Sequence, residues 1–269
     1  MLLRDKFWLW GHPEGCYNNK YGNTGISRMT PMEACLYLGI KNTFMVPDGD
    51  HQNVQVNRRQ YNKSFKTLQH VGWEFGHAFI NANGNTEAVD LFLEEVKEFP
   101  NISCAVFDDF MGQNGEKLSV EESAKFHERF RHNEIKRLDT WMVLYTHEFG
   151  LDPALDEKRK AYLALFDGII LWTWAEKDIS LIPEKFEILK RMAPAQRYMF
   201  GCYLWNFGEN KEATRDAVKW QLDWYRERIY AGEAEGVVFH TNTMADLDYD
   251  AYDAAIEWME EHGDEVLPE

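Results

Sequence analysis

Two adjacent carboxylates end a strongly apolar stretch of the chain. The segment AVFDDFMG (105–112) contains Asp108 and Asp109 and then a glycine suited to a turn. Ionised carboxylates beside an apolar strand are costly unless they are paired, hydrogen-bonded or shifted in pKa. A like charge close by raises the pKa of one partner, which is what a general acid at neutral pH requires. The pair is therefore a candidate for the two-carboxylate cleavage of a glycosidic bond.

The adjacency of the two aspartates sets a geometric condition. Neighbouring residues of a strand point to opposite faces, so the two side chains share a site only where the strand breaks into its loop. The following Met111 and Gly112 permit such a break. In the alternative arrangement, one aspartate faces the site while the other caps the next helix or binds a backbone amide.

The elements that must position this pair alternate along the chain. Eight short runs of apolar, aromatic or β-branched residues each end in polar residues, at 7–12, 43–48, 73–79, 102–109, 141–148, 168–176, 197–206 and 236–242. Runs this apolar are typical of strands covered on both faces. Helical patterns lie between them, two of which open with capping boxes, Thr30–Glu33 and Ser119–Glu122.

Strand and helix repeated eight times predict an α/β fold, a single-domain (β/α)8 TIM barrel over residues 1–269. An open doubly wound sheet is the competitor, but no G-x-G-x-x-G follows the first strand. In such barrels the carboxyl ends of the strands and the loops after them build the active site. The aspartate pair ends the fourth predicted strand and therefore belongs at the mouth.

Other polar and aromatic residues stand at the same strand ends. Indoles beside carboxylates, amides and imidazoles suit a sugar ring, whose C–H faces stack while its hydroxyls form hydrogen bonds. The alternative is that these tryptophans fill the barrel or cap its helices. Two further carboxylates, Glu148 and Glu176, are candidate catalytic groups. The predicted substrate-binding residues are Trp10, His12, Asp48, His77, Tyr145, His147, Trp172, Trp174, Trp205, Asn206, His240 and Asn242.

The dipeptide in FDDF resembles the paired acids of retaining N-acetylhexosaminidases, which are glycoside hydrolases with a barrel fold. The resemblance implies that Asp108 orients the 2-acetamido group of the substrate and that Asp109 protonates the leaving group. The segments VLYTHEF, LWTWAEKD, GCYLWNFG and EGVVFHTNTMADLDYDAYDAAIEWM are similar to a group of uncharacterised bacterial barrels found with carbohydrate-processing genes. A standard retaining enzyme carries a nucleophile carboxylate near strand seven or eight, where this chain has Asn206.

Composition limits the partners. The formal net charge of −16 argues against binding the phosphate backbone of a nucleic acid. The sequence contains no run of 18 apolar residues, the length that a membrane-spanning helix needs. We therefore expect a small-molecule or oligosaccharide substrate, no nucleic-acid or membrane partner and no cofactor. An apolar run within six residues of the start leaves no room for a signal peptide, so a cytoplasmic location is expected unless one was removed. The sequence carries no signal for an oligomeric state.

Two other functions stay open at this point. A metal-dependent sugar isomerase or hydrolase could draw ligands from the histidines and acids at the strand ends, although neither H-x-H after the first strand nor H-E-x-x-H is present. We predict that no metal is bound. A catalytically silent sugar-binding barrel is the other alternative. The long loop at 13–29, with Tyr17 and Tyr21, is predicted to be a lid or a wall of the site.

Overall fold

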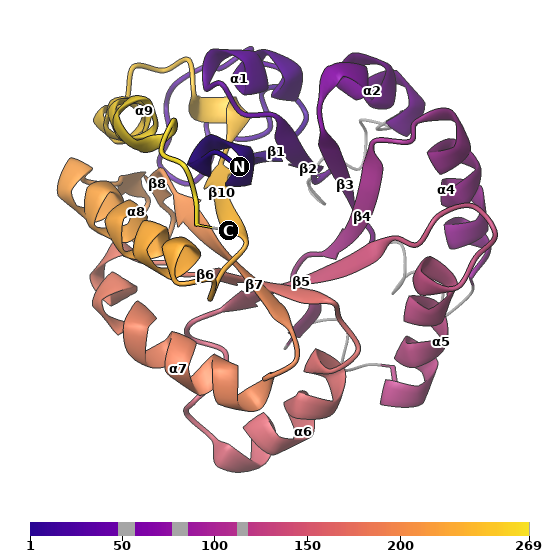
Figure 1. Ribbon diagram of the computed structural model, residues 1–269. Coiled ribbons are helices and arrows are strands. Elements are labelled where there is room, and N and C mark those ends of the chain that lie inside the picture. Colours follow the sequence, from indigo (N-terminus) through magenta and orange to yellow (C-terminus); the bar gives the residue numbers. More distant parts are fainter. Residues whose placement is uncertain (48–56, 77–85, 112–117, 269) are drawn as a thin grey trace.

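The computed structural model describes residues 1–47, 57–76, 86–111 and 118–268. Eight parallel strands form a closed barrel in the order β1-β10-β7-β6-β5-β4-β3-β2, and the helices surround it (Figure 1). This confirms the predicted (β/α)8 barrel. The strands are β1 (Phe7–Gly11), β2 (Asn42–Met45), β3 (His70–Glu74), β4 (Ile102–Phe107), β5 (Asp139–Tyr145), β6 (Gly168–Trp172), β7 (Arg197–Tyr203) and β10 (Gly236–His240).

The helices follow the strands in the order that the sequence predicts. They are α1 (Pro31–Tyr37), α2 (Arg58–Ser64), α4 (Glu87–Glu98), α5 (Val120–Arg131), α6 (Pro153–Leu163), α7 (Ile182–Met192), α8 (Arg215–Tyr230) and α9 (Asp250–His262). Both predicted capping boxes are present, at Thr30 for α1 and at Ser119 for α5. No described helix is long and apolar enough to cross a membrane.

Alternation along the strands divides the buried residues into two cores. One side of each strand packs against the helices, as Leu9 and Phe107 do. The other side fills the barrel, as Trp8, Trp10 and Val106 do. Because side chains alternate with a period of two, the residue that continues the inward series at a strand's carboxyl end must face the mouth.

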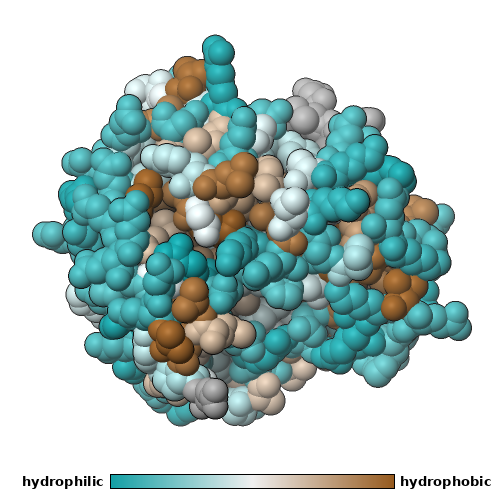
Figure 2. Space-filling view, turned by 45° about the horizontal axis from the view of Figure 1, so that its top comes forward, coloured by the Kyte–Doolittle hydropathy of each residue, from teal (hydrophilic) through white to brown (hydrophobic). Residues whose placement is uncertain are grey.

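Several strands end before the predicted runs do, and the run at 197–206 is divided between two strands. The run 197–206 does not form one strand, because β7 ends at Tyr203 and Trp205–Asn206 form β8, which pairs antiparallel with β9 (Lys211–Glu212). This hairpin lies outside the barrel sheet. The face drawn in Figure 2 is largely hydrophilic, with apolar residues in small separate patches, in keeping with the mean hydropathy of −0.52.

Candidate active site

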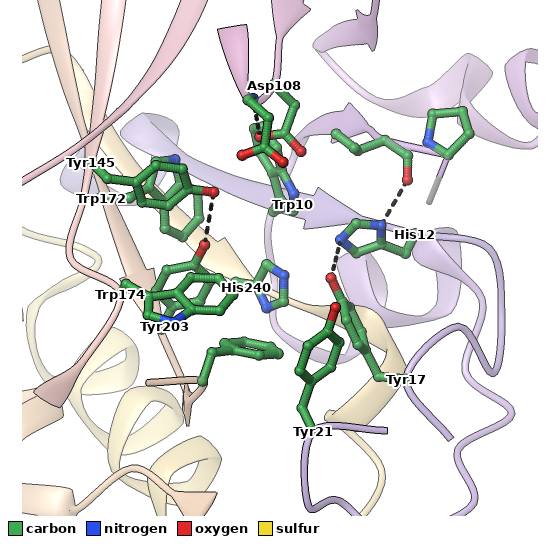
Figure 3. A pocket seen from close by; sticks show the side chains of 14 residues that line it. Trp10, His12, Tyr17, Tyr21, Asp108, Tyr145, Trp172, Trp174, Tyr203 and His240 are labelled. Carbon is green, nitrogen blue, oxygen red and sulfur yellow. Dashed lines mark hydrogen bonds between the residues drawn. The ribbon is translucent and has the colours of Figure 1, made fainter. Parts of the chain in front are cut away.

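A cavity of about 240 Å³ opens at the carboxyl ends of the strands (Figure 3). Its lining combines two carboxylates, two imidazoles and a majority of aromatic side chains. None of the described lining residues is a lysine or an arginine. The lining residues are Trp10, His12, Tyr17, Tyr21, Val46, Pro47, Asp108, Asp109, Tyr145, Trp172, Trp174, Tyr203, Phe207 and His240.

Both aspartates line this cavity. Asp108 continues the inward series of β4 after Val106. Asp109 has a φ of 47°, a backbone turn that breaks the alternation of the strand. Its backbone N–H donates to Oδ1 of Asp108 over 3.1 Å. The turn at the end of β4 therefore brings two adjacent carboxylates to one cavity, as the sequence required for a shared site.

Three predicted indoles form part of the wall. Trp10 and Trp172 meet edge to face with ring centroids 5.4 Å apart, and Trp174 is only partly buried. Trp172 lies against the backbone of β7, where a Cβ on Gly201 would stand 1.9 Å from its ring. Only glycine at position 201 leaves room for this indole. The partly buried Trp174 offers the ring most open to a sugar.

Two phenols stand beside the carboxylates. Tyr203 donates its hydroxyl hydrogen to the hydroxyl oxygen of Tyr145 over 3.5 Å. Burial raises the pKa of both tyrosines well above the ordinary value, and the negative charges of Asp108 and Asp109 raise it further. Both phenols are therefore neutral hydrogen-bond donors at physiological pH.

His147 lies just outside the cavity wall. Its exposed imidazole stacks on Tyr145 at 5.4 Å between ring centroids and 22° between ring planes. Burial of part of the ring lowers its pKa, an effect that the charge of Asp109 opposes. The predicted residue is therefore near the carboxylates, although it does not line the described cavity.

The two histidines of the cavity are held differently. Nδ1 of His12 is 2.7 Å from the carbonyl oxygen of Val46, and the Tyr17 hydroxyl lies 3.4 Å from Nε2. The His240 ring stands 5.3 Å from that of His12. Burial, with His12 as a neighbour, lowers the pKa of His240 well below its ordinary value, so His240 is neutral at physiological pH.

Asn242 supports this histidine pair from outside the cavity. Its side-chain oxygen accepts the backbone N–H of His12 over 2.7 Å, and its amide donates to the carbonyl oxygens of His12 and Met29 over 3.0 and 2.8 Å. Asn242 is fully buried. Asn242, which was predicted to bind substrate, thus contacts the protein backbone.

The other predicted carboxylates do not line the cavity. Glu148 accepts the backbone N–H of Tyr145 over 2.8 Å and so closes its own turn. Glu176 accepts the N–H and the hydroxyl of Thr214 over 2.8 and 2.9 Å, at the start of α8. Both carboxylates hold backbone in place outside the aspartate pair's cavity.

Trp205 and Asn206 also lie away from the cavity, because β7 ends before them. The Trp205 indole donates to the carbonyl oxygen of Tyr21 over 3.0 Å. The Asn206 amide donates to Glu209 over 2.6 Å. The predicted residues Asp48 and His77 lie outside the described residues. Within residues 1–47, 57–76, 86–111 and 118–268, no three His, Cys, Asp or Glu side chains form a metal site.

Three residues at or near the cavity are not among those predicted from the sequence, namely Tyr203, Phe207 and Glu74. Tyr203 follows Met199 and Gly201 on the inward face of β7, so the period of two could have identified it. Glu74 ends β3 and is buried. A Cβ placed on Gly76 would stand 3.0 Å from Oε1 of Glu74 and 3.1 Å from the carbonyl oxygen of Asp108. The Glu74 carboxylate therefore lies close to the aspartate pair.

The loop at 13–29 forms a wall of the cavity. Tyr17 and Tyr21 line it, and the loop is tied internally by Asn18 and Ser27, which exchange two hydrogen bonds of 2.9 and 3.1 Å. Asn23 accepts the Tyr249 hydroxyl over 2.5 Å. These bonds anchor the loop to itself and to the segment after β10.

Comparison with known proteins shows the fold. No protein-family model matches the chain, and no curated protein has a significantly similar sequence. Active domain 2 of a thermostable chitinase from Pyrococcus furiosus, solved with chito-oligosaccharides, is similar with a TM-score of 0.64, 12% identity and 97% coverage of both chains. The PgaB (BpsB) glycoside hydrolase domain from Bordetella bronchiseptica is similar with a TM-score of 0.52 and 10% identity, over 93% of this chain and 98% of that one.

The same barrel also occurs with other chemistry. Tryptophan synthase from M. tuberculosis is similar with a TM-score of 0.51 and 11% identity, over 97% of this chain and 94% of that one. Because fold does not fix function, these likenesses establish the architecture and leave the chemistry to the site. The chain has a TIM-barrel fold that is shared with glycoside hydrolases.

Proposed function

We propose that this barrel hydrolyses a glycosidic bond of a sugar bound in the cavity at its mouth. The observation that carries the proposal is the placement of Asp108 and Asp109 on one cavity walled by Trp10, Trp172 and Trp174. Glycosidases use two carboxyl groups around an oxocarbenium-like transition state. The barrel fold, which is shared with two glycoside hydrolase domains, is compatible with this chemistry.

The hydrogen bond between the aspartates suggests how their roles divide. Oδ1 of Asp108 accepts the backbone N–H of Asp109, which suits an ionised carboxylate. We therefore assign to Asp109 the proton that passes to the leaving oxygen as the bond between C1 and that oxygen breaks. The charge of Asp108 then stabilises the positive charge that develops at the anomeric carbon. The oxygen of a water molecule bonds to that carbon, and a proton of the water returns to Asp109.

The aromatic residues supply binding. The rings of Trp10, Trp172 and Trp174 contact the apolar faces of the sugar, and the hydroxyl of Tyr145, which accepts the hydrogen of Tyr203, donates a hydrogen bond beside the aspartates. Excluding water around the carboxylates strengthens their effect on the developing charge. An oligosaccharide or a small glycoside is the substrate class that this wall suits.

A panel of 4-nitrophenyl glycosides of glucose, galactose, mannose and N-acetylglucosamine, in both anomers, tests the proposal. Chito-oligosaccharides, with products read by mass spectrometry, complete the panel. We expect hydrolysis of at least one compound at a rate that EDTA leaves unchanged. Loss of activity with EDTA would instead indicate a metal-dependent enzyme. Sugar binding without turnover across the panel would indicate a non-catalytic binding barrel.

A further inference from the structure

His240 and Trp172 are the residues of the described cavity lining whose buried side-chain nitrogens have no hydrogen-bond partner. The His240 side chain lines the cavity and the residue is only 3% exposed. Its Nδ1 is covered and has no hydrogen-bond partner among the described residues. The protein covers Nδ1, so a ligand in the cavity can reach only the part of the ring that lines the cavity. Because buried polar side chains are nearly always hydrogen-bonded, this otherwise unpaired ring is a candidate for contact with a ligand.

The position of His240 is fixed by packing. Its ring centroid lies between 4.9 and 6.0 Å from five aromatic rings, which come from β1, β6, β7 and the loops next to them; they are His12, Tyr17, Trp172, Tyr203 and Phe207. Figure 3 shows the ring standing at the cavity between Tyr203 and His12. A side chain held this way keeps one orientation, so any hydrogen bond it forms to a ligand is directional.

The topology places this ring opposite the aspartates. In the closed order β1-β10-β7-β6-β5-β4-β3-β2, β10 and β4 are four strands apart in a ring of eight. Asp108 follows β4 and His240 ends β10, and Figure 3 shows them on opposite sides of the cavity. A sugar whose glycosidic oxygen meets Asp109 therefore turns its remote hydroxyls toward His240.

We propose that an imidazole nitrogen of His240 hydrogen-bonds a hydroxyl of the sugar ring, and that the site thereby selects an uncharged sugar over its uronic acid. This inference rests on the proposed function, because it places the scissile bond at the aspartates. A neutral imidazole has one donor and one acceptor, which matches a hydroxyl.

The charges around the cavity support the selection. A carboxylate on the sugar would add a second negative charge to that of Asp108, and no described lining residue is a lysine or an arginine that could compensate it. Burial keeps the pKa of His240 low, so this ring adds no positive charge at physiological pH. Two like unit charges roughly 5–6 Å apart, at an effective dielectric of about 20, repel by an energy that corresponds to an affinity loss on the order of 10²-fold.

The test is a binding titration followed by intrinsic tryptophan fluorescence. The probes are glucose, galactose, mannose and N-acetylglucosamine, with glucuronic and galacturonic acids as the charged partners. His240→Phe keeps an aromatic ring and removes both nitrogens. We expect it to weaken binding of the preferred sugar about 10-fold or more, with an unchanged melting temperature. His132→Phe, on a side chain that is 72% exposed, is the matched control and should bind normally.

A second variant covers the case in which His240→Phe does not fold. His240→Gln retains a donor and an acceptor, and we expect it to bind within a few-fold of the wild type. Normal binding by His240→Phe would overturn the proposal, as would equal losses in folded His240→Phe and His240→Gln or uronic acids that bind as tightly as the neutral sugars. Because binding needs no turnover, a barrel that binds through His240 without hydrolysis would refute the proposed function alone.

Discussion

The backbone N–H of Asp109 donates to Oδ1 of Asp108 over 3.1 Å at the point where β4 ends. The positive φ of Asp109 makes this arrangement possible, because it breaks the alternation that would send the two side chains to opposite faces. Non-glycine residues in this backbone region are uncommon and aspartate is among the tolerated types. The local turn thus converts two consecutive residues into a pair at one cavity.

Asn242→Ala should destabilise the fold and disturb His12. The fully buried Asn242 side chain forms three hydrogen bonds with backbone groups of His12 and Met29. Alanine would leave buried backbone donors and acceptors unpaired, for which we expect a loss of about 2–4 kcal/mol. Urea denaturation measures the free energy of unfolding. A loss below about 1 kcal/mol would show that water or a rearranged loop replaces these bonds.

The loop at 13–29 should resist proteolysis whether or not sugar is present. Its hydrogen bonds to itself, to Trp205 and to Tyr249 describe a fixed wall rather than a lid that closes on a substrate. Trypsin can cut after Lys20 and Arg28, and mass spectrometry identifies the fragments. Rapid cleavage in the absence of sugar, slowed by the sugar that binds best, would instead favour the lid.

Stability should fall on acidification in part through His127. Burial lowers the pKa of this histidine to about 3, against an ordinary value of 6.5. Between pH 3 and pH 6.5, His127 therefore binds a proton in the unfolded chain but not in the folded chain. The stability that this group contributes above pH 6.5 is lost as the pH falls toward 3. The loss approaches about 1.4 kcal/mol per pH unit for this one group.

His127→Leu should remove that contribution, because leucine does not titrate and suits the neighbouring Phe107 and Phe166. Thr140, which pairs with the His127 ring, also donates its hydroxyl hydrogen to Asp167 over 3.1 Å and keeps that bond. Urea denaturation of wild type and variant at pH 7, 6 and 5 gives the difference in slope. His132→Leu is the exposed control. Parallel curves for wild type and His127→Leu would contradict the assignment.

Much of the barrel could be predicted from the sequence because alternation and capping are local. The period of two places Trp10, Trp172, Tyr145 and His240 on the inward face or at its end, and all four line the cavity. If β7 had been predicted to end at Tyr203, the period of two would have added Tyr203 to the predicted cavity residues. The break after Tyr203 leaves no local signal, because the residues after it are as apolar as those before.

The roles of Glu148 and Glu176 could not be predicted in the same way. Each stands just after a strand, where a catalytic carboxylate would also stand. Glu148 is held by a backbone N–H within its own turn, whereas Glu176 is held by Thr214, which is 38 residues away. Tertiary contacts decide whether a carboxylate after a strand binds the backbone or faces the cavity. These contacts cannot be read from any single segment of the sequence.

The measurement that tests the central claim most directly is the rate of glycoside hydrolysis by Asp109→Asn. The amide keeps the shape of the side chain and removes the proton that the leaving oxygen needs. We predict that kcat falls about 10²–10⁴-fold while sugar affinity changes only a few-fold. Asp264→Asn is the control, since its carboxylate pairs with Arg4 at the surface. Wild-type kcat in Asp109→Asn, with the same sugar bound, would contradict the account.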